Sequence, residues 1–155
     1  MTPPESERQM VVFSLHGESY ALPVDSVREI IRYRAPTVTA AAGGLVQGMI
    51  SLHGQVLPIV DLSSRLGQRL EIDRATRIMV VELRRGALGL IVDTVEGVWG
   101  VPTTQIEPLP VPVARDGLGR EVAAVGERLI MLIDPEKALS GALPRRAPRR
   151  QTTTE

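Results

Sequence analysis

The sequence predicts a mainly β protein built from small antiparallel barrels, and three observations favour this class. Short runs rich in Val, Ile and Leu recur in pairs around glycine-containing turns, a pattern typical of β-hairpins. Helical patterns are brief, and two segments of the chain resemble two later ones. Strands without long connecting helices favour barrels over a parallel sheet with crossover helices.

Four hairpins are expected along the chain. Each consists of two apolar runs around a turn with a glycine, a residue that adopts positive φ without a steric penalty. The pairs are Met10–Leu15 with Ser19–Pro23, Met49–Leu52 with Val56–Val60, Ile78–Leu83 with Ala87–Val92, and Val122–Val125 with Leu129–Ile133.

Two short helices are expected. Residues 25–33 predict about two turns with Val27, Ile30 and Ile31 on one side. Asp134 followed by Pro135 predicts a helix start, because Asp caps free backbone N–H groups and Pro is favoured at the first helical position.

An internal repeat predicts two related lobes. Residues 24–30 match residues 92–98 at an offset of 68, and residues 54–62 parallel residues 126–135 at an offset of 73. Chance similarity among Val-rich strands is the alternative. We place the lobes at about 10–75 and 76–139, with strand exchange between them left open, after a flexible N-terminus at 1–9. Residues 140–155 are expected to form a disordered basic tail.

Composition excludes several classes of function. The 155 residues are enough for one domain or two small lobes, and no Cys is present to form a disulfide, a thiolate metal site or a thiol nucleophile. The formal net charge is zero, so bulk attraction to nucleic acid or anionic lipid is not expected. Because neither a signal peptide nor an apolar run of membrane-spanning length is found, we expect a cytoplasmic protein.

Three aspartates and a basic tail leave two other functions open. Asp61, Asp93 and Asp134 follow apolar strands, where they could hold a divalent cation for phosphoryl transfer or, as we favour, act as structural caps. A nucleic-acid site on the arginines of the tail is disfavoured because no aromatic residue is interleaved to stack on bases. No catalytic motif is found, which favours a protein-binding module.

Three segments carry a resemblance to a known family: Val27-Arg28-Glu29-Ile30-Ile31, residues 48–62 (GMISLHGQVLPIVDL), and Gly89-Leu90-Ile91-Val92-Asp93-Thr94-Val95. In this order they resemble the CheW-like chemotaxis coupling proteins, from about Met10 to Leu139. The resemblance implies two five-stranded SH3-like barrels around a shared core. It also implies a non-enzymatic adaptor, without cofactor or metal, that links the cytoplasmic tips of chemoreceptors to the regulatory domain of the histidine kinase CheA.

The resemblance places the partner-binding residues on the protein surface. A helical receptor tip would enter an apolar groove between the lobes, near Val27, Ile30, Val95 and Val98. The full set of candidates is Val27, Glu29, Ile30, Gly48, His53, Gly54, Val95 and Val98. Neither nucleic acid nor direct membrane insertion is implied, and recruitment to membrane-associated receptor arrays is expected.

His53 departs from the family pattern. The family usually has Arg in this turn, and the resemblance pairs that Arg with the equivalent of Glu29. His is shorter than Arg and lacks its permanent charge, so the ion pair is in doubt. The alternative function is therefore a divergent accessory protein that binds receptors but not the kinase.

Overall fold

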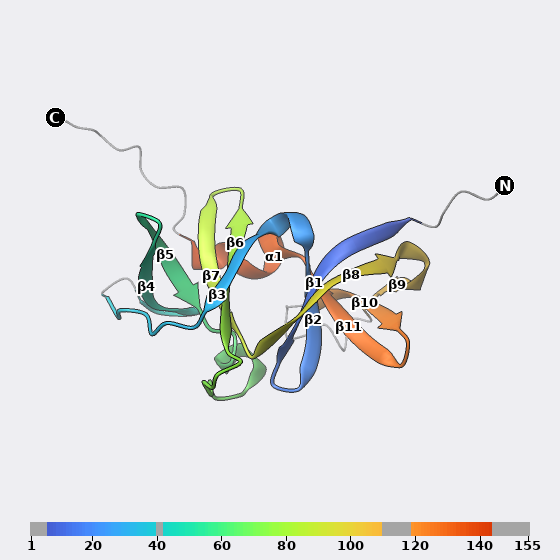
Figure 1. Ribbon diagram of the computed structural model, residues 1–155, viewed down its shortest axis with the longest axis horizontal. Helices are drawn as coiled ribbons and strands as arrows, with labels where there is room; N and C mark the ends of the chain where they lie inside the picture. Colours follow the sequence, from blue (N-terminus) through green and yellow to red (C-terminus); the bar gives the residue numbers. More distant parts are fainter. Residues whose placement is uncertain (1–5, 40–41, 110–118, 144–155) are drawn as a thin grey trace.

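Two β-sheets and one short α-helix make up residues 6–39, 42–109 and 119–143, the part of the chain that the computed structural model describes (Figure 1). The six-stranded sheet has the order β8-β1-β2-β11-β10-β9, and the five-stranded sheet has the order β3-β6-β7-β5-β4. The first contains β1 (Glu7–Leu15), β2 (Glu18–Pro23), β8 (Thr94–Pro102), β9 (Ile106–Pro108), β10 (Gly119–Val125) and β11 (Arg128–Ile133). The second contains β3 (Val27–Arg32), β4 (Val46–Leu52), β5 (Gln55–Val60), β6 (Arg77–Leu83) and β7 (Gly86–Val92). The mainly β fold with two sheets is confirmed, and within the described ranges no helix is long and apolar enough to cross a bilayer.

All four expected hairpins are observed, as β1–β2, β4–β5, β6–β7 and β10–β11. The turns use positive φ, because the backbone twist of such turns matches that of the strands they join. Two of them place a histidine before a glycine in this region: His16 has φ 49° before Gly17, and His53 has φ 51° before Gly54.

Strand registers reproduce both offsets of the sequence repeat. Val27 pairs with Val81 in one sheet and Val95 with Phe13 in the other, so both partners keep the offset of 68.

The offset of 73 appears in the parallel ladders. Ile59 pairs with Gly89, whereas Leu132 pairs with Ala21, so β5 corresponds to β11 while β7 corresponds to β2.

The β-bulges also coincide in the two sheets. A register shift lies between Val46 and Gly48 in β4 and between Gly119 and Glu121 in β10, again 73 residues apart. A bulge is a built feature of a strand rather than a defect. Its recurrence at equivalent positions shows that the two barrels share one plan.

Each barrel takes strands from both halves of the sequence. The chain crosses from the six-stranded to the five-stranded sheet between β2 and β3, and returns between β7 and β8. The sheets therefore do not divide near residue 75, because β1 and β2 pair with β8 and β11, and β6 and β7 complete the other barrel. The sixth strand, β9, corresponds to an isolated bridge between Thr37 and Met49 in the other sheet.

Three expectations about local structure are wrong. Residues 27–32 form strand β3 after a 3-10 turn at Val24–Ser26, since pairing with β6 overrides the helical spacing. At the N-terminus, β1 already begins at Glu7. At the C-terminus, Ser140–Ala142 form a 3-10 turn and Leu143 is buried, so the expected tail is ordered at its start; residues 144–155 and 1–5 lie outside the described residues.

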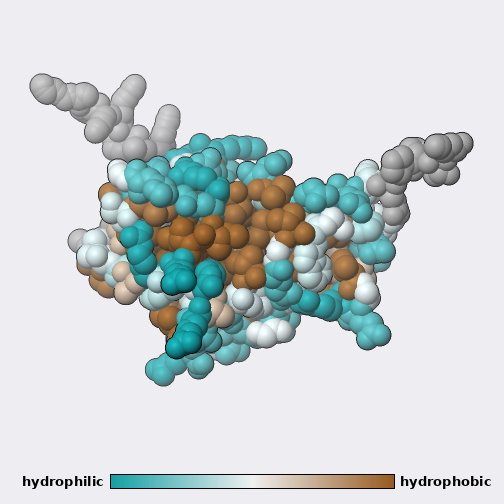
Figure 2. Space-filling view, in the orientation of Figure 1, coloured by the Kyte–Doolittle hydropathy of each residue, from teal (hydrophilic) through white to brown (hydrophobic). Residues whose placement is uncertain are grey.

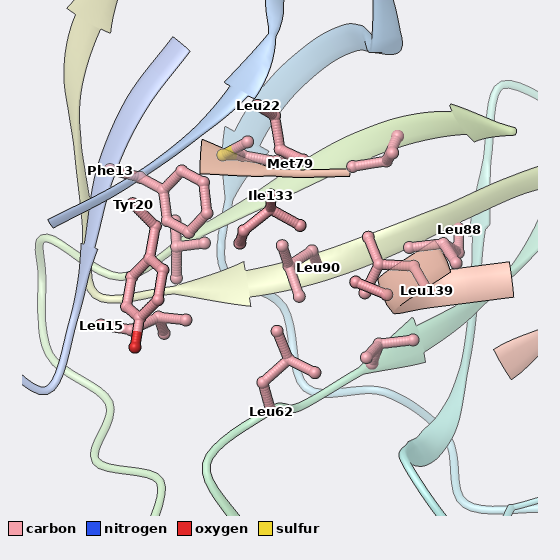
Figure 3. Packing of buried hydrophobic residues seen from close by; sticks show 14 of the residues in the cluster. Phe13, Leu15, Tyr20, Leu22, Leu62, Met79, Leu88, Leu90, Ile133 and Leu139 are labelled. Atoms are coloured by element: carbon pink, nitrogen blue, oxygen red, sulfur yellow. The ribbon is translucent and has the colours of Figure 1, made fainter. Parts of the chain in front are cut away.

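Three apolar clusters form the interior. One fills each barrel, and the largest lies between them, with contributions from β1, β2, β5, β6, β7 and the C-terminal helix α1 (Pro135–Leu139). Figure 3 shows this shared cluster around Phe13, Tyr20, Leu90 and Leu139. The rings of Phe13 and Tyr20 stack with centroids 6.0 Å apart. Because the shared cluster is continuous, the barrels bury apolar surface against each other as well as within themselves.

Candidate partner-binding surface

The two crossings of the chain present equivalent apolar residues on β3 and β8. Val27 and Val95, 68 residues apart, are partly buried and pack against the shared core. Ile30 and Val98, also equivalent, are exposed by 41% and 57%. Figure 2 shows apolar surface gathered over β3 and toward its junction with the other barrel, bordered by hydrophilic side chains. A groove that joins all four residues stays a prediction.

His53 and Glu29 lie next to each other despite the change from Arg. The His53 Nε2 atom is 3.1 Å from Glu29 Oε2 and 3.3 Å from Oε1. The contact joins the β4–β5 turn to β3, and both side chains are accessible to solvent. The pair is ionic only when the imidazole is protonated, whereas an Arg would carry its charge at all relevant pH values.

Gly48 and Gly54 have structural reasons to be glycine. A Cβ at Gly48 would overlap the Thr37 carbonyl group and lie 2.8 Å from its carbon. Gly54 has φ 76° with open space around it, so its backbone conformation, not crowding, selects glycine. Gly48 lets the β3–β4 connection lie against β4, and Gly54 closes the turn that carries His53.

The three aspartates are each engaged by backbone N–H groups. Asp134 caps α1 by accepting from Glu136 and Lys137, as expected, and Asp61 accepts from Ser63 before the 3-10 turn Ser64–Leu66. Asp93 differs, because strand β8 follows it instead of a helix; its Oδ2 accepts from the His16 N–H at 2.7 Å. Among the described residues, no group of three or more His, Asp or Glu side chains is placed to hold a metal ion.

Two polar clusters beside Ile30 and Val98 were missed by the sequence analysis. Arg28 on β3 binds the Glu82 carboxylate and donates to Gln55 Oε1 at 3.0 Å. At the equivalent place on β8, Arg128 donates to Glu96 at 2.8 and 3.0 Å. Both clusters fix a strand against the neighbouring hairpin.

Arg128 also lies over the indole of Trp99, with Cζ 5.2 Å from the ring centroid, within cation–π range. The hydrogen bond from Arg128 lowers the pKa of the Glu96 carboxyl below its ordinary value, with burial acting in the opposite direction. Trp and Arg are enriched in the residues that dominate protein interfaces, and the single Trp of the chain was the signal that could have pointed to this cluster.

Comparison with known proteins identifies the family. A family model described as CheW-like domain matches residues 9–142. The chain belongs to the CheW-like family. The chemotaxis protein CheW of Klebsiella aerogenes is 32% identical over 140 residues, which cover 86% of this chain and 82% of that protein. CheW of Bacillus subtilis is also 32% identical, over 84% of this chain and 86% of that protein.

A solved CheW structure has the same architecture. The scaffolding protein TtCheW of Thermoanaerobacter tengcongensis superposes with a TM-score of 0.75 at 30% identity, covering 83% of this chain and 89% of that one. The likeness therefore extends over both barrels of the CheW-like chain, not over one lobe.

Proposed function

We propose that this chain is a non-enzymatic adaptor in chemotaxis signalling, which couples the cytoplasmic tips of chemoreceptors to the regulatory domain of the kinase CheA. Membership of the CheW-like family supports the signalling role, and the structural relative TtCheW is a scaffolding protein. The protein acts in the cytoplasm, recruited to membrane-associated receptor arrays.

The observation that carries the proposal is the exposure of apolar side chains at equivalent places on both barrels. Ile30 and Val98 lie on β3 and β8, each followed along its strand by a residue that is half-buried. An amphipathic helix such as a receptor tip binds by placing its apolar face against such side chains. Val27 and Val95 support them from the shared core.

His53 bears on the alternative of an accessory protein that binds receptors but not the kinase. Its contact with Glu29 at 3.1 Å keeps the β4–β5 turn joined to β3. The geometry thus favours retention of both partners, and the kinase regulatory domain is the partner that decides between the two functions.

Binding measurements test the proposal. The chain is mixed with a receptor cytoplasmic fragment and, separately, with the CheA regulatory domain. We expect Ile30→Asp and Val98→Asp to weaken receptor binding about tenfold or more, as for central interface residues. Val38→Asp is the matched control, because Val38 is 76% exposed and lies outside β3 and β8. Equal affinity of all three variants would contradict the assignment, and failure of the unmodified chain to bind CheA would favour the accessory function.

A further inference from the structure

The six-stranded barrel has an open end beside the start of β1. A cavity of about 520 Å³ is found there. Its apolar lining includes Met10, Pro23 and Leu132, and its rim includes Arg120 and Lys137. Arg8 on β1 reaches across to Glu121 on β10, with Nη1 and Oε1 2.8 Å apart.

The corresponding end of the five-stranded barrel is closed by its own chain. Under the offsets of 68 and 73, the counterparts of Met10, Pro23 and Leu132 are Ile78, Ile91 and Ile59. All three counterparts are buried in the core of that barrel. Leu70, from the connection between β5 and β6, packs against this core. A segment that precedes the first strand of the barrel therefore covers its apolar interior.

The equivalent segment of the six-stranded barrel is the beginning of the chain. At the offset of 68 that relates β6 to β1, residues 69–73 correspond to residues 1–5. The Ser6 carbonyl accepts from the Thr103 N–H at 3.0 Å, which holds the entry to β1 at this end of the barrel. Five extended residues span up to about 17 Å, enough to reach from Ser6 over the cavity.

The charges and apolar groups of the two parts are complementary. Within residues 6–39, 42–109 and 119–143, no acidic group is paired with Arg120 or Lys137. Asp134, which also lines the cavity, is occupied in capping α1. Residues 1–5 supply apolar side chains at Met1, Pro3 and Pro4 and a carboxylate at Glu5.

We propose that the open end of the six-stranded barrel is a binding site for residues 1–5 of the same chain. The prolines lie over Met10 and Leu132, and the Glu5 carboxylate faces the cations of the rim. The site takes a short segment with apolar side chains and one carboxylate, so the N-terminus closes this barrel as Leu70 closes the other.

Cross-linking of the full chain tests this site, because Lys137 is the only lysine of the sequence. A carbodiimide joins a carboxylate to an amine only when the two are in contact. We expect an amide between Glu5 and Lys137, found by mass spectrometry of the tryptic peptides, with Glu7 in β1 as the comparison carboxylate. The double variant Pro3→Asp, Pro4→Asp should lose the cross-link and acetylate faster at Lys137. Its Trp99 fluorescence should be unchanged, which reports an intact fold.

The origin of the cross-link is decided with a mixture of ¹⁵N-labelled and unlabelled protein. A cross-link within one chain supports the proposal. A cross-link found only between labelled and unlabelled chains would assign the site to a second copy and overturn it. Absence of the Glu5 cross-link, with Lys137 acetylated equally fast in the wild type and the double variant, would overturn it as well.

Discussion

Gly48 is a position where one added methyl group is expected to destabilise the protein. In Gly48→Ala the new Cβ would overlap the Thr37 carbonyl and lie 3.2 Å from Pro36 Cβ. Thr37 and Met49 exchange two backbone hydrogen bonds of 2.8 and 2.9 Å, which hold the β3–β4 connection against β4. The methyl group can be accommodated only if Thr37 moves away from β4, which weakens both bonds.

The magnitude follows from two opposing effects. Each lost hydrogen bond costs about 0.5–1.5 kcal/mol net, so the pair costs about 1–3 kcal/mol. Replacing glycine by alanine at a compatible φ stabilises by about 0.4–1 kcal/mol through the unfolded chain. The steric effect therefore wins, and we expect a net loss of about 1–2 kcal/mol in the free energy of unfolding.

Urea denaturation of Gly48→Ala beside Gly141→Ala measures this effect. Gly141 has nothing within 4 Å of the added Cβ, so the control should be unchanged or slightly stabilised. Equal stability of the two variants would refute the steric argument at Gly48. A loss well above 4 kcal/mol would show that more than the Thr37 bridge is disrupted.

Three further predictions concern polar contacts. Asp93→Ala removes the acceptor of the His16 N–H and should cost about 1–2 kcal/mol in urea denaturation; a loss no larger than that of Asp25→Ala, at the exposed equivalent position, would count against it. Because the folded-state pKa of Glu96 is lowered, its contribution is full above the ordinary value of 4.5 and is lost as pH falls through the folded value. Glu96→Gln should therefore be less stable than wild type at pH 7 and equal to it in strong acid, and a difference independent of pH would exclude this cause. His53→Arg should make the contact with Glu29 ionic at every pH and change stability by less than about 1 kcal/mol; a larger change would contradict its exposed position.

The sequence predicted the hairpins because their turns leave a local signal. Gly17, Gly54, Gly86 and Gly126 interrupt apolar runs at the points where the backbone needs positive φ. The repeat offsets were also readable, since β3 and β8 carry similar residues at equivalent positions.

Strand β3 could not be read from its own residues. Glu29 occupies a half-buried position between Val27 and Ile31, which breaks the alternation of apolar and polar residues and leaves a spacing typical of a helix. Pairing with β6 decides the structure, and this partner lies about 50 residues away in the sequence. The exchange of β1 and β2 into the later barrel is hidden for the same reason.

The candidate site was predicted in its apolar part and missed in its polar part. Ile30 and Val98 are recognisable as β-branched residues within the family motif and its repeat. The contacts of Arg128 with Glu96 and Trp99 join residues about 30 positions apart. They depend on how β8 lies beside the β10–β11 hairpin, which only the folded chain specifies.

The most direct test of the adaptor function is whether one molecule holds both partners at once. The chain, a receptor cytoplasmic fragment and the CheA regulatory domain are mixed at equal concentrations and sedimented in an analytical ultracentrifuge. A complex that contains all three proteins, and that does not form when the chain is left out, is the predicted result. Binding of receptor and kinase domain in mutually exclusive complexes would contradict the coupling function, even if each partner binds alone.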